Sequence, residues 1–106
     1  MKIIEIKEIY EATNGGLDVF CYFFSEIDPE NPKKTLRLHP DDRMPTAGLF
    51  KAHGIWFLKD HSGTDPKAYT AIEFVRKKQD LSFADSVIWI AERFAPHLLS
   101  IKINTQ

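Results

Sequence analysis

Cysteine is nearly absent from this chain, and long apolar runs are absent altogether. The single cysteine, Cys21, excludes an internal disulfide and falls short of the paired thiolates that a structural zinc site needs. A lone thiol is typical of a reducing cytoplasm, so a cytoplasmic location is expected. No apolar run reaches the roughly 18 residues of a membrane span, and charges interrupt segment 1–5 too early for a signal peptide. A membrane is therefore not expected as a partner.

Recognisable catalytic motifs are also missing. The chain has no Walker loop, no nucleophile elbow and no paired-histidine metalloprotease motif. Asp41, Asp42, Asp60 and Asp65 fall in predicted loops, where aspartate favours turn formation, and no base, nucleophile and orienting group accompany them. We therefore expect a protein that is not an enzyme and that uses no cofactor.

Net charge is small, but its distribution is uneven. The formal net charge of the 106 residues is −1. Residues 33–78 hold ten basic and five acidic residues, whereas the rest of the chain holds four and ten. A protein with a net charge close to zero can thus still have a positively charged binding face, although ordinary solvated surface charge explains the asymmetry equally well. With 43% hydrophobic and 12% aromatic residues, the composition predicts one folded domain with a modest core.

The first half of the chain predicts helices followed by a ribbon. Apolar spacing favours a helix over residues 3–13, which Asn14, Gly15 and Gly16 then stop. Residues 17–27 fit a helix or an alternating strand, and their length and the preceding glycines favour the helix. A short strand is expected at 35–38. Residues 48–51 and 55–59 are expected to form a β-hairpin that turns at 52–54.

The second half predicts two amphipathic helices. Ala68, Ala71, Ile72 and Val75 follow helical spacing. After a tight connection at 79–81, Ser82 is a good N-cap, with Asp85 three residues on near the positive end of the helix dipole. The face expected to be buried in this second helix consists of Phe83, Val87, Ile90, Ala91 and Phe94.

Three short motifs in residues 36–94 carry a family resemblance. They are Asp42 to Ala47 (DRMPTA), Leu81-Ser82-Phe83 and Ala91-Glu92-Arg93. In this order and spacing the segment resembles the N-terminal zinc-ribbon domain of bacterial-type DNA primases. It is most similar to the cysteine-less forms in primase-like proteins of mobile elements and phages. The resemblance implies a template-positioning module for single-stranded DNA, with primer synthesis in another domain.

The zinc ligands of the resembled family are not matched here. Arg37 stands near the first cysteine position, Pro40 near the histidine, and Leu58 and His61 near the final cysteine pair. Leucine cannot bind a metal, so we expect a zinc-ribbon-like fold that has replaced its metal with packing. The expected fold class is α+β, with a small antiparallel ribbon of about three strands flanked by helices. Residues 1–95 would form this domain, and 96–106 an extension or the start of a linker.

Basic and aromatic residues interleave on the predicted ribbon and its loops. Cations on phosphates and aromatic faces under bases are the usual means of holding single strands. Alternation must nevertheless turn either Trp56 or Phe57 toward the core, and His61 either contacts phosphate or caps nearby backbone groups. The predicted nucleic-acid-binding residues are Arg37, Arg43, Lys51, Trp56, Lys59, His61 and Lys67.

Two other functions remain open at this point. The domain can instead be a protein-interaction module that docks on a primase polymerase or helicase domain through Trp89, Phe83 or the first helix. A small stand-alone structural protein is a third possibility. Basic residues that converge on one ribbon face favour DNA, whereas basic residues scattered over the surface, with an exposed apolar patch elsewhere, favour docking.

Overall fold

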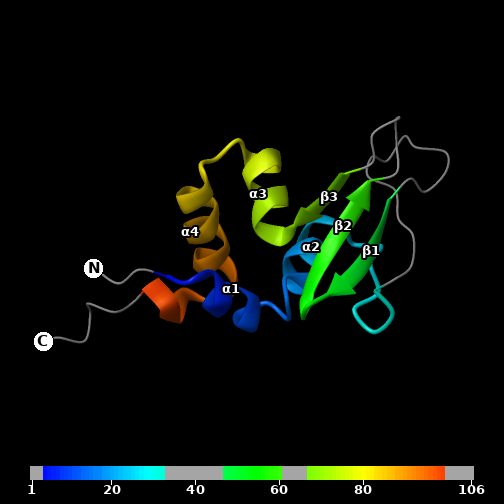
Figure 1. Ribbon diagram of the computed structural model, residues 1–106. Coiled ribbons are helices and arrows are strands. Elements are labelled where there is room, and N and C mark those ends of the chain that lie inside the picture. Colours follow the sequence, from blue (N-terminus) through cyan, green and yellow to red (C-terminus); the bar gives the residue numbers. More distant parts are fainter. Residues whose placement is uncertain (1–3, 33–46, 61–66, 100–106) are drawn as a thin grey trace, which may run out of the picture.

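The protein is an α+β domain built on a three-stranded antiparallel sheet, as predicted. The computed structural model describes residues 4–32, 47–60 and 67–99. The sheet has the strand order β1-β2-β3, with β2 in the centre (Figure 1). In chain order the elements are α1 (Ile6–Ala12), α2 (Leu17–Phe23), β1 (Ala47–Ala52), β2 (Ile55–Asp60), β3 (Lys67–Thr70), α3 (Ala71–Gln79), α4 (Phe83–Phe94) and the 3-10 turn η1 (Pro96–Leu99).

The first two helices meet at a glycine junction. Asn14, Gly15 and Gly16 all have positive φ angles, of 56°, 72° and 96°, so the predicted helix stop is confirmed. The junction also docks on the sheet, because Trp56 N donates to Gly15 O at 2.8 Å. A Cβ at position 15 would lie 2.5 Å from Gly54 O, so only glycine permits this close approach. The ambiguous segment that follows is the helix α2, which ends at Phe23 and not at Ile27.

The strand β3 is a departure from the sequence-based prediction. Helical spacing from Ala68 onward predicts that the helix has already begun there, but Lys67–Thr70 pairs with β2 as the third strand of the sheet. Thr70 then caps the helix. Its Oγ1 accepts from Glu73 N at 3.2 Å, and Glu73 Oε1 accepts from Thr70 N at 3.0 Å, which is a capping box. Helix α3 therefore begins at Ala71.

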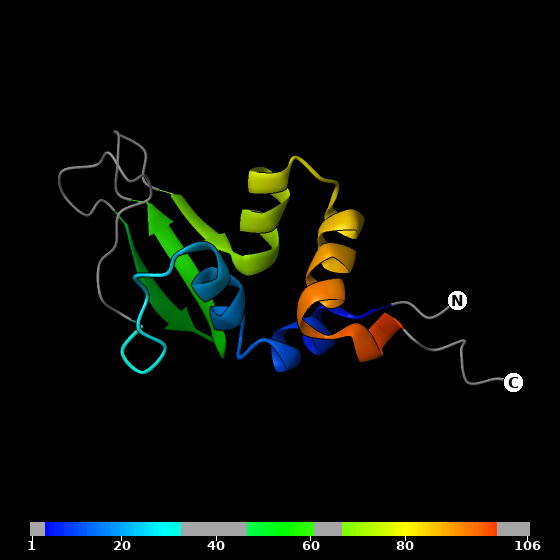
Figure 2. The same cartoon turned by 180° about the vertical axis from the view of Figure 1, so that it is seen from behind.

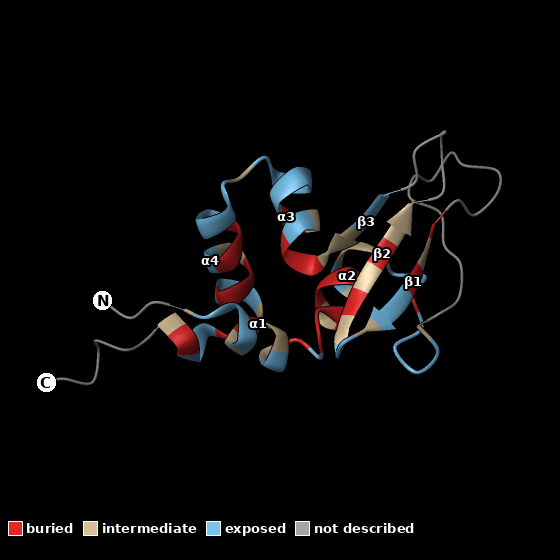
Figure 3. Ribbon diagram, in the orientation of Figure 1, coloured by how far each residue is buried: buried red, intermediate tan, exposed pale blue. Residues whose placement is uncertain are grey.

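Helix α4 begins where the sequence predicts. Ser82 Oγ accepts from Asp85 N at 3.1 Å, and the helix runs from Phe83 to Phe94. Val87, Ile90 and Ala91 of the predicted face are buried. Phe83 departs from this prediction: it occupies the first position of α4 and is 45% exposed. Figure 3 shows the start of α4 in the pale blue of exposed residues.

The helices divide into two groups around the sheet. Figure 2 shows α2 lying across one face of the sheet, while α1, α4 and η1 form a separate group that α3 joins to the sheet. One continuous core connects the two groups and includes Phe20 of α2, Leu58 of β2 and Ile90 of α4. Leu98 of η1 is 8% exposed and belongs to the same core, so the core continues past the domain boundary predicted at residue 95.

Several predictions fall outside the described residues. These are the short strand at 35–38 and the site residues Arg37, Arg43 and His61. Residues 100–106 of the predicted extension 96–106 also lie there.

Candidate nucleic-acid interface

The β1–β2 hairpin positions most of the predicted site residues that the structure describes. His53 and Gly54 have φ angles of 55° and 79°, the positive values that a two-residue type I′ turn requires. The turn sets the register, so that Phe50 faces Phe57 and Lys51 faces Trp56 across the hairpin. Because side chains alternate between faces, this register decides which residues are buried and which meet solvent.

The inner face of the hairpin belongs to the core. Leu49, Trp56 and Leu58 are 4%, 8% and 1% exposed. Trp56 is therefore the aromatic residue that alternation turns inward, and its predicted stacking role is corrected, because the side chain belongs to the core and exposes little surface to a base.

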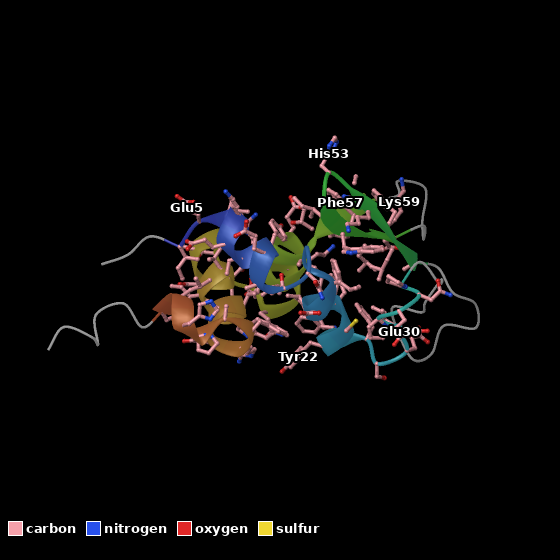
Figure 4. All side chains as sticks on the ribbon, turned by 90° about the horizontal axis from the view of Figure 1, so that it is seen from below. Glu5, Tyr22, Glu30, His53, Phe57 and Lys59 are labelled. Atoms are coloured by element: carbon pink, nitrogen blue, oxygen red, sulfur yellow. The ribbon has the colours of Figure 1, made fainter. Side chains whose placement is uncertain are left out.

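The outer face carries an aromatic pair in its place. The rings of Phe50 and Phe57 stack with centroids 5.1 Å apart and planes 9° from parallel. Phe50 is 38% exposed, and Phe57 is half-buried. Figure 4 shows Phe57, Lys59 and His53 along the ribbon on one side of the molecule, with Tyr22 on the other. An aromatic pair at the surface with a cation two residues along the strand is chemically suited to contact a base and its phosphate.

Lys51 lies on a different surface from Lys59. It is opposite Trp56 in the register, and its Nζ lies 5.9 Å from the centroid of the Trp56 ring. Lys51 also lines an open groove of about 800 Å³ between the hairpin turn and α1, together with Lys7 and His53. The two lysines in this groove can attract an anion, although Glu11 also lines it and reduces the local positive charge.

Lys67 lies at the outer strand β3. It is exposed and faces Asp60 across the β2–β3 ladder, where opposite charges are favourable. Of the seven predicted site residues, the structure thus describes four: one is buried, and the three lysines lie on different parts of the surface. This scatter of the lysines favours docking, whereas the Phe50–Phe57 pair beside Lys59 favours DNA.

Two features of this region are not in the predicted site. The Phe50–Phe57 pair is the first, and a two-residue turn within the predicted hairpin would have revealed it, because the register follows from the turn. The second is Tyr69 of β3, whose hydroxyl accepts from Lys77 Nζ at 3.1 Å. No local signal predicts the second feature, because β3 itself was assigned to a helix.

Two observations in the described residues concern metal and thiol chemistry. Within residues 4–32, 47–60 and 67–99, no three histidine, cysteine or acidic side chains gather as a metal site. Burial, with smaller effects of Asp18 and Asp28, raises the pKa of the Cys21 thiol, which makes it a poorer nucleophile at neutral pH. None of the described helices is long and apolar enough to cross a bilayer.

No protein-family model, no curated protein and no solved structure matches this chain.

Proposed function

We propose that this domain is a non-catalytic DNA-binding module that positions template DNA in a primase-type replication protein of a phage or mobile element. The exposed Phe50–Phe57 stack beside Lys59 carries the proposal. Stacking platforms with adjacent cations hold single strands without reading their sequence, as template positioning requires. The resemblance of residues 36–94 to primase zinc-ribbon domains supports the same function and implies that primer synthesis lies in another domain. The single cysteine supports a cytoplasmic location.

The outer ribbon face would use two kinds of contact. Phe57 and Phe50 offer ring faces to bases, and Lys59 offers a cation to the neighbouring phosphate. Neither contact needs a metal or a reacting group, since binding and orientation are all that this module supplies.

Fluorescence anisotropy of labelled oligonucleotides tests this function. Wild-type protein is expected to prefer a single strand to a duplex and to bind more weakly as salt is raised. Phe57→Ala should weaken binding about tenfold, within the range of one lost stacking contact. Lys59→Ala should reduce the slope of affinity against salt by about one phosphate contact.

Lys78→Ala serves as the matched control, since it removes an exposed lysine from α3, away from the outer ribbon face. Equal losses in Lys59→Ala and Lys78→Ala would mean that binding follows net charge alone. Absence of binding at low salt, at protein concentrations on the order of tens of micromolar, would contradict the proposal.

A second function, docking on a polymerase or helicase domain, has its own support. Tyr22 of α2 is 58% exposed, and its ring contacts Trp89 and Phe94 of α4 at centroid distances of 5.7 and 5.9 Å. Arg93 lies 3.9 Å from the Trp89 ring centroid. Exposed aromatic and arginine side chains in one patch are typical of binding hot spots. Retention of partner binding by Phe57→Ala, together with its loss in Trp89→Ala, would favour docking over DNA.

A further inference from the structure

A small pocket opens on the inner side of the sheet, away from the Phe50–Phe57 pair. It has a volume of about 280 Å³ and lies between the end of α2, the strands β2 and β3, and α3. Small-molecule sites usually measure about 300–1,000 Å³, so this pocket has the size of one large side chain and its immediate neighbours.

The wall of the pocket is aromatic and its floor is aliphatic. Phe24 and Phe74 lie side by side with ring centroids 5.5 Å apart, and both rings are half-buried. Leu58, which is 1% exposed, closes the floor. Tyr69 adds a third ring at the β3 side. An apolar group that enters here is removed from water without leaving a buried polar group of its own unsatisfied.

The rim of the pocket is positively charged. Lys77 Nζ donates to the Tyr69 hydroxyl at 3.1 Å and lies 5.1 Å from the centroid of its ring, which holds the ammonium at the mouth. Lys78 stands beside it in the last turn of α3. Asp60 also lines the pocket and interacts electrostatically with Lys77, so two lysines stand against one aspartate and the rim keeps a net positive charge. The two lysines of α3 therefore determine the sign of charge that the rim favours.

These features favour a peptide over a nucleic acid as the occupant. A nucleobase would carry several N–H and C=O groups into the pocket, where Phe24, Leu58 and Phe74 offer them no hydrogen-bond partner. A phenylalanine or leucine side chain has no such groups. A carboxylate next to that side chain would meet Lys77 and Lys78. The pocket and its rim therefore both favour an apolar side chain flanked by acidic residues.

We propose that this pocket binds a peptide segment of a partner protein in which one large apolar side chain is flanked by acidic residues. The apolar side chain packs over Leu58 against the rings of Phe24 and Phe74, and the acidic residues pair with Lys77 and Lys78 at the rim. The inference is independent of DNA binding by the outer ribbon face, because the two surfaces share no residue.

Three capped tripeptides test the pocket: Glu-Phe-Glu, Glu-Ala-Glu and Lys-Phe-Lys. Each is titrated into the full chain labelled with nitrogen-15, and the backbone amide signals of Leu58, Tyr69 and Phe74 are followed by NMR. The first peptide should shift these signals in a saturable way. The alanine peptide should bind about tenfold more weakly, since it lacks the buried ring, and the lysine peptide should also bind about tenfold more weakly.

Variants of exposed residues keep the fold intact while they test the rim. The double variant Lys77→Ala/Lys78→Ala should weaken Glu-Phe-Glu about fivefold and remove most of its salt dependence, whereas Lys7→Ala on α1 should leave binding unchanged. Equal binding of Glu-Phe-Glu and Lys-Phe-Lys, or no shift at millimolar peptide, overturns the proposal. An oligothymidine that shifts the same three signals overturns it in favour of a nucleobase.

Separate variants distinguish a failure of peptide binding in the pocket from a failure of DNA binding on the outer ribbon face. The lysine double variant should retain DNA binding, because it leaves the outer ribbon face intact. Conversely, Phe57→Ala should retain the tripeptide, because Phe57 points to the opposite face of the sheet from Leu58.

Discussion

The two faces of the ribbon come from the same strands but have opposite environments. Leu49 and Leu58 face each other on the inner side and are almost fully buried, whereas their neighbours Phe50 and Phe57 face each other on the outer side and reach solvent. One residue along the strand therefore separates a core position from a surface position. Large apolar side chains occur on both faces, so hydrophobicity alone does not indicate which face stabilises the fold and which is open to a ligand.

The largest difference between the faces is expected in stability. Leu58→Ala removes a side chain that is 1% exposed and should lower the free energy of unfolding by about 2–5 kcal/mol. Phe57→Ala should lower it by less than half as much, because its ring already meets solvent on the outer face. Urea unfolding followed by circular dichroism measures both. Equal losses would show that the outer face is packed as tightly as the inner one.

Two glycines sharpen the same contrast. Gly15→Ala places a methyl group 2.5 Å from Gly54 O at a φ of +72°, so it should cost about 2–3 kcal/mol through strain and displacement of the hairpin turn. Gly48→Ala on the outer face meets no atom within 4 Å and should be neutral or stabilise the strand by about 0.5 kcal/mol. Thermal unfolding compares the two variants. A Gly15→Ala protein as stable as the wild type would mean that the junction does not hold the hairpin.

Thr70 connects the ribbon to the helices and should show a smaller effect. It faces Phe57 in the β2–β3 register, and its hydroxyl caps α3. Thr70→Ala removes the cap and should lower stability by about 1 kcal/mol, whereas Thr70→Ser keeps the hydroxyl and should recover most of that loss. Urea midpoints decide between the two. If serine is no better than alanine, the contribution of Thr70 comes from the strand and not from the cap.

The smallest expected effect is a dependence on high pH in the helical half. Burial raises the pKa of Tyr10 above its ordinary value of 10.0, with a hydrogen bond to Thr70 acting in the opposite direction. The unfolded chain therefore loses this proton first, so the contribution is intact below pH 10 and is lost as pH rises past 10.

Tyr10→Phe should accordingly flatten the fall in stability between about pH 9 and pH 11. Tyr22→Phe, which changes an exposed tyrosine, should leave that fall as it is in the wild type. Parallel curves for the wild type and Tyr10→Phe would argue against burial as the cause.

Local signals predicted much of this fold. The N-cap Ser82, the glycine stop after α1 and the β1–β2 hairpin all depend on residues that are close in sequence, and all three are confirmed. The turn itself is His53-Gly54, one residue shorter than the predicted turn at 52–54, because Ala52 pairs with Ile55. The predicted start of α3 is wrong, because Ala68 shares helical spacing with Ala71 and Ile72 but lies in the strand β3. Pairing with β2 satisfies the backbone of Lys67–Thr70, and such non-local pairing overrides a weak periodic preference.

The candidate site was less predictable than the fold. Basic and aromatic residue types were visible in the sequence, but Trp56 is buried and Lys51 and Lys59 lie on different surfaces. Orientation in a strand depends on register, and register depends on the exact turn. The inner pocket is even less local, since Phe24, Leu58 and Phe74 come from three separate segments.

The sequence by itself therefore determined the helix caps, the glycine junction and the hairpin turn, because these depend on backbone conformation and hydrogen bonds between near neighbours. Only the tertiary structure decided that β3 joins the sheet, that Trp56 rather than Phe57 enters the core, and that Lys77 and Lys78 stand at the mouth of an aromatic pocket. Each of these depends on the packing of segments distant in the chain, and burial of apolar surface, which has no preferred direction along the sequence, is what brings such segments together.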